Sequence, residues 1–493
     1  MEEGQKEVQI KFSNSQREEV LKSDKTLLQA SKALILEKKD PYEENPERWF
    51  NLVAFCFCIF ANGFQWLAFT NISEQFSYFH DKALWKINLF STLFFIIYPL
   101  VSIPEAIFLE KYSIKIGLFI ASGGTLLGSF FKIFVHKDKT LAVCYLGQIL
   151  PALIRPMLLN SPGKISSNWF GDNKRTLICS ICCLSDTAGI LVGYLWNLAY
   201  VKENLKKKDF DDQIFRYFLS EFILIFLFCV PAFFIKKGNP ENPSSPSQDK
   251  NNLKDLNLAD SLKLLLGKKR FIFLAISSFF IVGYYLFVGT SINNLLYIYD
   301  LHSKKTTTIF SVSFTAGILS SIIISIILDK NKKFKLFLVS LSFLALIFQA
   351  FLTFLLELSF SKNLNEFAIG IVFYILIHST VIPFYTIGMN YACELTYPVN
   401  ESISGAVIMS MAHLCGLISF YLFDHFLSDI ENKSWLTNVI ILVFFFIALI
   451  FIFISDEQLI RDEIEKEGRK NSDDMKENNN PKTVEIKQTE KKE

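Results

Sequence analysis

The chain has 493 residues, of which 51% are hydrophobic, 15% aromatic and 20% charged. A soluble protein of this length would divide into domains joined by polar linkers. Here, instead, apolar runs of about 20 residues recur along most of the chain, each long enough to cross about 30 Å of hydrocarbon as a helix. Composition therefore predicts a polytopic membrane protein and excludes a soluble enzyme, a nucleic-acid binder and a secreted disulfide scaffold. The net charge of +2 indicates no particular partner.

The apolar runs form two groups of six, separated by a Pro-, Ser- and Asn-rich stretch that cannot bury enough apolar surface to fold alone. The runs lie near 49–72, 87–109, 113–135, 140–166, 176–200 and 214–235, and then near 270–297, 306–328, 334–358, 366–393, 402–425 and 435–455. The pattern predicts an all-α membrane protein with twelve transmembrane helices. Its expected parts are an N-terminal tail (1–48), a six-helix bundle (49–235), a linker (236–269), a second six-helix bundle (270–455) and a disordered tail (456–493). That last tail is expected to start as a helix extension before it becomes a mixed-charge disordered segment.

The distribution of Lys and Arg between the loops predicts the orientation. An even number of helices places both tails and the linker on one side of the membrane, and the loops on that side carry more Lys and Arg than the opposite loops. Basic loops favour the cytosolic side. Both termini and the linker are therefore expected in the cytosol. The plasma membrane is the expected location, with an internal membrane as the alternative.

The two groups of runs carry matching turns, which indicates an internal duplication. An acid followed by basic residues stands after the second run (Glu110 to Lys115) and again after the eighth (Asp329 to Lys335). Such charges at a tight turn can pair with each other and with helix ends. We therefore expect these four residues to lock neighbouring helices on one face of the membrane. Ordinary positive-inside loop charge is the alternative explanation for each turn taken singly.

This organisation, with acid-plus-basic turns after the second and eighth helices, resembles the major facilitator superfamily. Several segments are similar, more specifically, to the feline leukaemia virus subgroup C receptor family, over about 48 to 455 and in neither tail. The resemblance implies two six-helix bundles that rock about a midplane cavity. It also implies transport of choline or ethanolamine, with haem and vitamin B6 as substrates credited to other members. The segments are Arg48-Trp49-Phe50, Asn62-Gly63-Phe64-Gln65-Trp66, Gly147-Gln148, Pro162-Gly163-Lys164-Ile165-Ser166-Ser167-Asn168-Trp169-Phe170-Gly171 and Glu394-Leu395-Thr396-Tyr397-Pro398.

Polar residues inside the first run are candidate substrate ligands, because an isolated polar group in hydrocarbon is costly. Asn62, Gln65 and Trp66 share one helix face by their i, i+3 and i+4 spacing. The resemblance implies that Trp66 belongs to an aromatic cage that holds a quaternary ammonium by cation–π attraction; a place in the interfacial aromatic belt is the alternative. The second cage aromatic of the family falls on Leu286, so its neighbour Tyr285 is the candidate.

Two opposite charges stand in adjacent apolar runs. Arg155 and Asp186 occupy positions where the family has glutamine and asparagine. An unpaired charge within the membrane is far costlier than a paired one, so we predict an Arg155–Asp186 ion pair, or a cavity in which both meet a zwitterionic substrate. The alternative is that Arg155 binds a carboxylate or phosphate of the substrate.

Further candidates lie in the second half. Asn390 and His413 fall on a family glutamate and glutamine, so the carboxylate of the cavity is expected to move from helix 10 to helix 5. Histidine is the side chain whose ordinary pKa lies near neutral pH, so His413 is a candidate for coupling transport to protons. A hydrogen-bonded interhelical histidine is the alternative. The remaining expected gate or structural residues are Trp169, Arg175 and Glu394.

No sequence motif indicates catalysis. The chain lacks a phosphate-binding G-x-x-x-x-G-K-[ST] loop, a nucleophile elbow and an H-E-x-x-H helix, and its nine cysteines lie in or beside apolar runs without a metal-binding pattern. We therefore expect no enzyme and no cofactor, but a monomeric secondary transporter of a small amine, with substrate and lipid as partners. One alternative is an anionic or porphyrin-type substrate, such as haem, an organic anion or a vitamin B6-like compound. Another is a non-transporting receptor or structural subunit of a membrane complex.

Overall fold

The structure of the protein is a computed structural model. It describes residues 42, 45–135, 141–200, 207–251, 257–297, 299, 301, 303–362, 365–428 and 434–478. Two compact units are distinguished, Met1–Glu43 and Glu44–Glu493, and all helices described below belong to the second. The described residues are helical and contain no strand. The predicted N-terminal tail up to residue 41 and the end of the chain from residue 479 lie outside the described residues.

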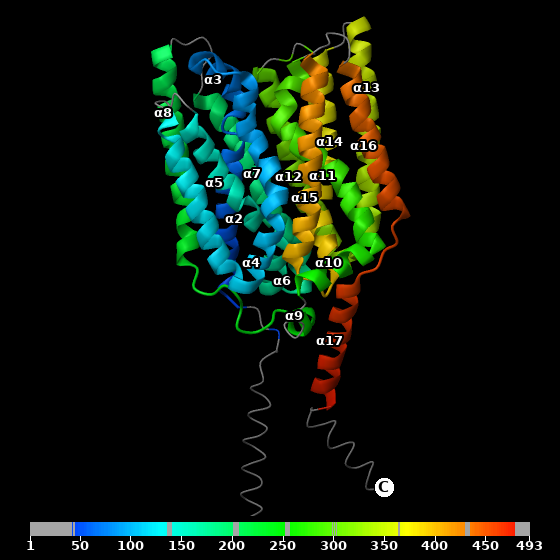
Figure 1. Cartoon of the computed structure of the whole chain (residues 1–493). Helices are drawn as coiled ribbons and strands as arrows, with labels where there is room; N and C mark the ends of the chain where they lie inside the picture. Colours follow the sequence, from blue (N-terminus) through cyan, green and yellow to red (C-terminus); the bar gives the residue numbers. More distant parts are fainter. Residues whose placement is uncertain are drawn as a thin grey trace, which may run out of the picture. The chain divides into compact units, whose positions relative to one another are not determined.

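The helices follow the predicted runs closely (Figure 1). Eleven of the described helical segments are long and apolar enough to cross a membrane. The helices of the first half are α2 (Arg48–Trp66), α3 (Ser73–His80), α4 (Leu84–Lys132), α5 (Ala142–Leu159), α6 (Pro162–Trp169), α7 (Arg175–Tyr200) and α8 (Lys207–Cys229). Those of the second half are α11 (Lys269–Tyr297), α12 (Ser303–Asn331), α13 (Phe334–Lys362), α14 (Glu366–Thr396), α15 (Glu401–Ser428) and α16 (Ser434–Ile454).

Helix α4 combines two of the predicted runs. Its 49 residues would span about 74 Å as a straight helix, more than twice the hydrocarbon thickness of about 30 Å. The helix is interrupted at Ser113, which has φ 79° and ψ 157°. The two segments fold against each other there. The evidence is that a Cβ atom on Gly117 would overlap the side chain of Leu109, which precedes the interruption. Residues 84–112 and 114–132 are each long enough to cross the membrane, and the count of twelve crossings stays a prediction.

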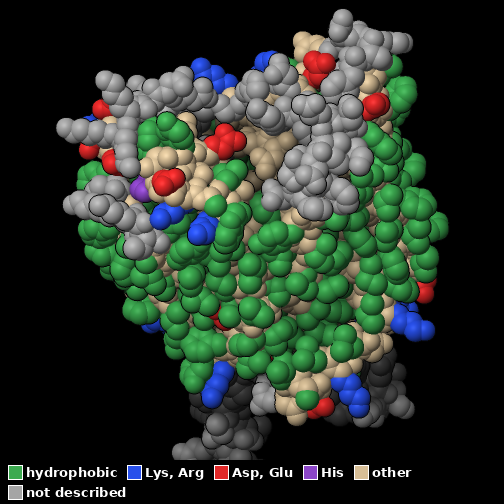
Figure 2. All heavy atoms as spheres, turned by 45° about the horizontal axis from the view of Figure 1, so that its top comes forward, with side chains coloured by type: hydrophobic (Ala, Val, Ile, Leu, Met, Phe, Trp, Pro, Cys, Tyr) green, Lys and Arg blue, Asp and Glu red, His purple; other side chains and the backbone are tan. Residues whose placement is uncertain are grey.

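Apolar side chains cover the outside of the helices. Figure 2 shows a broad band of hydrophobic side chains, with the Lys, Arg, Asp and Glu side chains gathered toward the two ends. Large hydrophobic side chains such as Leu227, Phe354 and Phe453 are exposed, whereas arginine, histidine and amide side chains lie buried inside. A contiguous exposed apolar surface of this kind suits lipid contact. The predicted all-α membrane fold is confirmed.

Each half packs mainly against itself. Helices α2, α4, α5, α7 and α8 contact one another in the first half, as do α11 to α16 in the second. The halves meet where α7 packs on α12 and α14 and where α15 packs on α4. Side chains on α7 and α4 therefore face the junction between the halves.

Glycines bring α2 and α7 into close contact. A Cβ atom on Gly189 would overlap the carbonyl oxygen of Phe60, and one on Gly193 would overlap that of Phe64. On α2, a Cβ on Gly63 would lie 2.6 Å from Asp186 Oδ1. Small residues allow membrane helices to approach at backbone distance. The glycines thereby hold Asp186 directly against the α2 backbone.

The linker and the C-terminal tail both contain helices. The linker contains α9 (Pro246–Asn251) and α10 (Leu258–Gly267), and the tail, predicted to start as a helix extension, contains α17 (Ile460–Asn478). Helix α17 packs on α9 and α14, at the end of the helices that also carries α6 and α10 (Figure 1). The high proportion of charged residues in the tail favours disorder when only composition is considered. It does not show that Arg461 and Glu465 are buried against partners on other helices.

We predict that Gly189→Ala lowers the thermal stability of the purified protein, because overpacking a tight helix contact costs about 1 to 3 kcal/mol. Gly123→Ala is the control, since a Cβ there meets nothing within 4 Å and alanine is the better helix former. Thermal unfolding in detergent is the measurement. Equal unfolding temperatures for the two variants would contradict the close α2–α7 contact.

Candidate functional site

A buried ion pair joins α5 and α7, as the sequence predicts. Arg155 Nη2 lies 2.9 Å from Asp186 Oδ2, and both side chains are at most 2% exposed. Arg155 also donates from Nη1 to Asn62 Oδ1 at 3.0 Å. Removing either partner would leave a charge uncompensated in a buried place, which is strongly unfavourable. The pair and Asn62 therefore form one unit across α2, α5 and α7.

The guanidinium group of Arg155 also lies against aromatic rings. Its Cζ is 5.0 Å from the centre of the Trp66 ring and 5.8 Å from that of Phe94. These distances are within the range of cation–π attraction. Trp66 is fully buried and donates from Nε1 to the carbonyl oxygen of Ser91 at 3.2 Å. A place in the interfacial aromatic belt is excluded for Trp66 by this burial.

Two amides on α2 are fixed by the backbone of neighbouring helices. Asn62 donates from Nδ2 to the carbonyl oxygen of Pro151 at 3.1 Å, and Gln65 donates from Nε2 to that of Thr125 at 3.2 Å. Asn62, Gln65 and Trp66 are all buried, and their shared face as substrate ligands stays a prediction. Of these three side chains, Asn62 alone forms a hydrogen bond with Arg155 in the described part of the chain.

Tyr285 contributes to this group from the second half. Its hydroxyl lies 3.0 Å from Thr187 Oγ1, next in sequence to Asp186, and Asp186 and Arg155 are within electrostatic range of it. The Tyr285 ring stacks on Tyr385 with a centroid distance of 5.7 Å. Tyr285 therefore joins α11 to α7 at the residue next to Asp186.

Other parts of the second half approach Trp66. A Cβ atom on Gly289 of α11 would lie 3.6 Å from the Trp66 ring. His413 stacks on Tyr98 of α4 with ring centres 3.8 Å apart, and its Nδ1 lies 2.7 Å from the carbonyl oxygen of Met409. A carbonyl only accepts, so this bond places the proton on Nδ1. We call Asn62, Gln65, Trp66, Arg155, Asp186, Tyr285 and His413 the central site.

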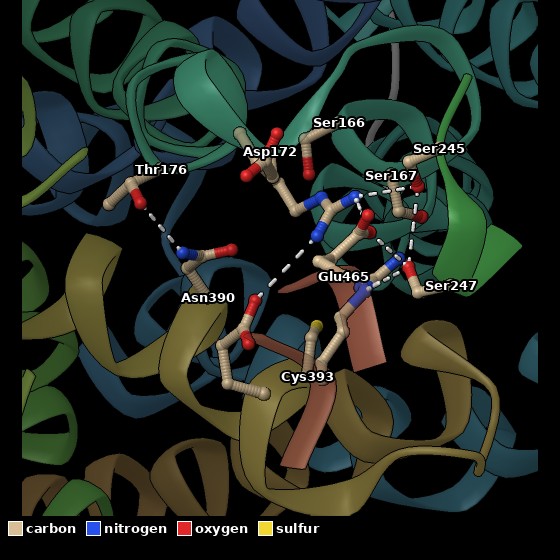
Figure 3. A network of polar contacts seen from close by, with 12 residues as sticks. Ser166, Ser167, Asp172, Thr176, Ser245, Ser247, Asn390, Cys393 and Glu465 are labelled. Carbon is tan, nitrogen blue, oxygen red and sulfur yellow. Dashed lines mark hydrogen bonds and ion pairs between the residues drawn. The ribbon is translucent and has the colours of Figure 1, made fainter. Parts of the chain in front are cut away.

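The eighth predicted ligand, Asn390, lies elsewhere. It donates from Nδ2 to Thr176 Oγ1 at 3.0 Å, near the start of α7. Figure 3 shows this contact within a second group of polar side chains. Asn390 therefore accompanies residues predicted to form the gate. The sequence placed it with the substrate ligands only through the family alignment.

The second group, here called the α17-end network, centres on Arg175. Arg175 Nη2 lies 3.0 Å from Glu465 Oε1 on α17 and donates to Ser245 Oγ at 3.1 Å, while Nη1 lies 3.9 Å from Glu394 Oε1 on α14. Glu465 also accepts a hydrogen bond from Ser247 (Figure 3). One arginine thus joins the first half, the linker, the second half and the C-terminal helix.

A second arginine, Arg461, also belongs to the α17-end network and contacts Ser247. Arg461 Nη2 lies 3.1 Å from Glu401 Oε1, and Arg461 Nε donates to Ser247 Oγ at 3.1 Å. Tyr397 donates from its hydroxyl to the carbonyl oxygen of Ser247 at 3.0 Å. Helix α17 is therefore attached to the linker and to the start of α15, and Tyr397 attaches the linker to the end of α14.

Asp329 joins the halves directly. Its two oxygens accept from the backbone N–H groups of Thr176 and Leu177, each at 2.9 Å, at the N-terminus of α7. A carboxylate at that position also meets the positive end of the helix dipole. Lys332 extends the contact by donating to the carbonyl oxygen of Asp172 at 2.8 Å.

The other predicted gate residues lie around this network. Trp169 is buried in α6, and Glu110 is exposed at the end of the first α4 segment. Lys115 donates to the carbonyl oxygen of Lys236 at 3.1 Å, and the backbone N–H of Lys335 donates to Glu457 Oε1 at 3.1 Å. In the second of the two matching turns, Asp329 reaches the start of α7 in the opposite half.

Ionised Glu465 maintains the contacts of α17 with Arg175 and Ser247 at neutral pH. Burial would raise the pKa of Glu465, but Arg175 and the hydroxyls of Ser247 and Ser245 outweigh burial and hold that pKa below its ordinary value. Because this pKa is lowered, the stability that ionised Glu465 contributes to the folded state is complete at a pH above the ordinary pKa of a glutamate. It is lost as the pH falls through the lowered pKa. Attachment of α17 is therefore expected to withstand mild acidification.

Several residues were missed from the sequence. Lys132 on α4 and Glu221 on α8 form a second buried ion pair, and both are charges inside predicted apolar runs, so the rule that selected Arg155 would have found them. Arg461 and Glu465 gave no such signal, because they stand in a uniformly charged segment. Within the described ranges, no group of three His, Cys, Asp or Glu side chains is arranged to hold a metal ion.

We predict that Arg155→Gln and Asp186→Asn each destabilise the protein by about 3 to 5 kcal/mol, because each leaves a buried charge without its partner. The double variant removes both charges and restores most of the stability. Thermal unfolding of the four proteins in detergent forms a double-mutant cycle. Additive losses in the double variant would contradict a direct pairing.

We predict that Glu465→Gln exposes the α17 end. Cys393 is buried beside this network, so the rate of maleimide labelling of a variant that retains only this cysteine reports opening. The rate should rise severalfold in Glu465→Gln, since a charge-assisted bond to Arg175 is lost. Lys466→Gln is the control, because this neighbour pairs only with Asp462 of its own helix among the described residues and is 74% exposed. Equal labelling of the two variants would contradict the role of Glu465.

Comparisons with known proteins agree with this architecture. A family model described as the Major Facilitator Superfamily matches residues 52–364. The choline/ethanolamine transporter FLVCR2 of Homo sapiens is 24% identical over 383 residues, covering 75% of this chain and 70% of the relative. The choline/ethanolamine transporter flvcr2a of Danio rerio is 25% identical over 444 residues, covering 86% and 90%. The family resemblance seen in the motifs is confirmed.

Solved structures show the same fold. The Escherichia coli fucose:proton symporter FucP superposes with a TM-score of 0.61 at 14% identity, covering 83% of this chain and 98% of that one. A second FucP structure, in the outward conformation, gives a TM-score of 0.63 at 13% identity, covering 83% and 99%. With two helical halves, a polar site at their junction and a family model that matches most of the chain, the protein belongs to the Major Facilitator Superfamily.

Proposed function

We propose that the protein transports a small amine, such as choline or ethanolamine, across the membrane by alternating access at the central site. The observation that carries the substrate class is the buried Trp66 ring with a cation held on its face. Such a face attracts an ammonium group even when methyl groups replace its hydrogen-bond donors. The choline/ethanolamine transporters among the relatives support the same class.

The surroundings of the site support alternating access. The α17-end network closes one end, while toward the other end Tyr194 of α7 donates to Asn293 Oδ1 of α11 at 2.7 Å and stacks on Phe310 of α12 at 4.3 Å. Tyr194 lies eight residues beyond Asp186, or about 12 Å along the helix. The halves thus contact each other on both sides of the ion pair. Rocking of one half against the other would open these layers in turn.

The proposal includes the topology. Helix α4 crosses the membrane twice with its turn at Ser113, giving twelve crossings, and α17, the linker and both termini lie in the cytosol. The protein acts as a monomer in the plasma membrane, performs no chemistry and needs no cofactor. An anionic or porphyrin-type substrate is less favoured, because Asp186 already neutralises Arg155 and the pair attracts no net anion.

We predict saturable uptake of labelled choline or ethanolamine into proteoliposomes containing the wild-type protein. Trp66→Ala should weaken apparent affinity at least about tenfold, because a desolvated cation–π contact contributes about 2 kcal/mol, and Trp66→Phe should retain part of it. Trp85→Ala is the control, since that tryptophan is exposed. Normal uptake by Trp66→Ala, or no amine uptake by a correctly folded wild type, would refute the proposed substrate site.

A further inference from the structure

We infer that Arg155 is a tethered cation that occupies the substrate's place on Trp66, and that the substrate is a small zwitterion carrying a carboxylate or phosphate beside its amine. The inference rests on the proposed function, because it names the substrate class of the same site. It differs in assigning Arg155 a part in selection in addition to its structural pairing with Asp186.

The first step is steric. The guanidinium group lies 5.0 Å from the centre of the Trp66 ring and 5.8 Å from that of Phe94. An ammonium group that binds Trp66 by cation–π attraction must come within about 6 Å of the same ring centre. Two cations at that separation in a buried site repel each other. The substrate amine therefore has to displace Arg155 from the ring.

The second step concerns which partner moves. Asp186 lies against the α2 backbone, since a Cβ on Gly63 would be 2.6 Å from its Oδ1 and 2.7 Å from its carbonyl oxygen. Arg155 instead has a long side chain on α5, held by hydrogen bonds to Asn62 and Asp186. The aspartate is thus fixed by packing, and the arginine is the group able to swing away from the ring.

The third step is the balance of charge. With Arg155 and Asp186 paired, the central site is neutral. A simple cation such as choline would add a positive charge that no second carboxylate of the site neutralises, because its other described members are amides, aromatic rings and a histidine. A zwitterion brings its own anion, so the loaded site stays neutral. Neutrality matters here because uncompensated charge within a membrane is costly.

The fourth step is the set of unused polar atoms. In the described part of the chain, Arg155 Nε is a buried donor without a hydrogen-bond partner, and Gln65 Oε1 is a buried acceptor without one. Asp186 Oδ1 and His413 Nε2 are likewise buried and unpartnered there. Buried polar groups are normally satisfied. A donor for an anion together with acceptors for an ammonium group complements a ligand that carries both.

The chemistry leaves two classes of anion open, and the experiment separates them. Purified protein in detergent is tested for ligand-induced thermal stabilisation, and in proteoliposomes for uptake. The probes are glycine betaine for the carboxylate class, phosphoethanolamine for the phosphate class, and choline for the simple cation. The wild type should bind and transport one of the zwitterions with at least tenfold higher apparent affinity than choline.

The variants are Arg155→Gln, Arg155→Lys and the double variant Arg155→Gln/Asp186→Asn, which removes both charges and guards against misfolding of the single change. In Arg155→Gln the preference should invert toward choline, because Asp186 is then free to neutralise it. Arg155→Lys, which keeps the charge but not the fork, should keep the zwitterion preference in weakened form. The double variant should lose the zwitterion preference without gaining choline.

Each outcome separates this inference from the proposed function. Choline transport by the wild type that equals or exceeds zwitterion transport, with a ratio unchanged in the Arg155 variants, would overturn the inference and leave the amine transporter standing. Zwitterion binding that depends on Arg155 without any uptake would support the ligand class and refute transport. If neither the three probes nor ethanolamine stabilises the folded wild type or is taken up by it, both the inference and the proposed function are overturned.

Discussion

The structure depends on one constraint, which is that a charge buried inside a membrane protein must meet its opposite. Arg155 and Asp186 meet this constraint at 2.9 Å, and the rest of the central site follows from where they are held. Asn62 takes the second Nη of the arginine, and the flat face of the guanidinium remains free for Trp66. A structural requirement thereby places a cation on the surface best suited to bind a substrate amine.

The pair is fixed because α2 and α7 touch at backbone distance. Gly63, Gly189 and Gly193 have no side chains to separate the helices, so Asp186 cannot withdraw from the site. On either side of the pair the two halves are joined by polar contacts, such as that of Arg175 with Glu394 at one end and that of Tyr194 with Asn293 at the other. Polar contacts of this kind can break and re-form without disrupting the apolar core of either half. The fold therefore combines a rigid centre with two ends that are able to open.

Sequence reasoning succeeded for features that depend on the hydrophobic pattern and charge of a single segment. The apolar runs predicted the helices, and isolated charges within runs predicted the Arg155–Asp186 pair. It was less successful for residues whose burial and contacts depend on partners distant in the chain. Helix α17 is charged along its length, and nothing in its sequence separates the buried Arg461 and Glu465 from exposed neighbours such as Lys466. Asn390 was placed by alignment alone, and only the structure shows its contact with Thr176.

The central claim is that substrate amine and Arg155 compete for the face of Trp66. The most direct test is an experimental structure of the protein with a transported amine bound. The account predicts the amine nitrogen over the Trp66 ring, with Arg155 swung away from it and Asp186 still against Gly63. A bound amine located elsewhere, with Arg155 unmoved on the ring, would contradict the claim.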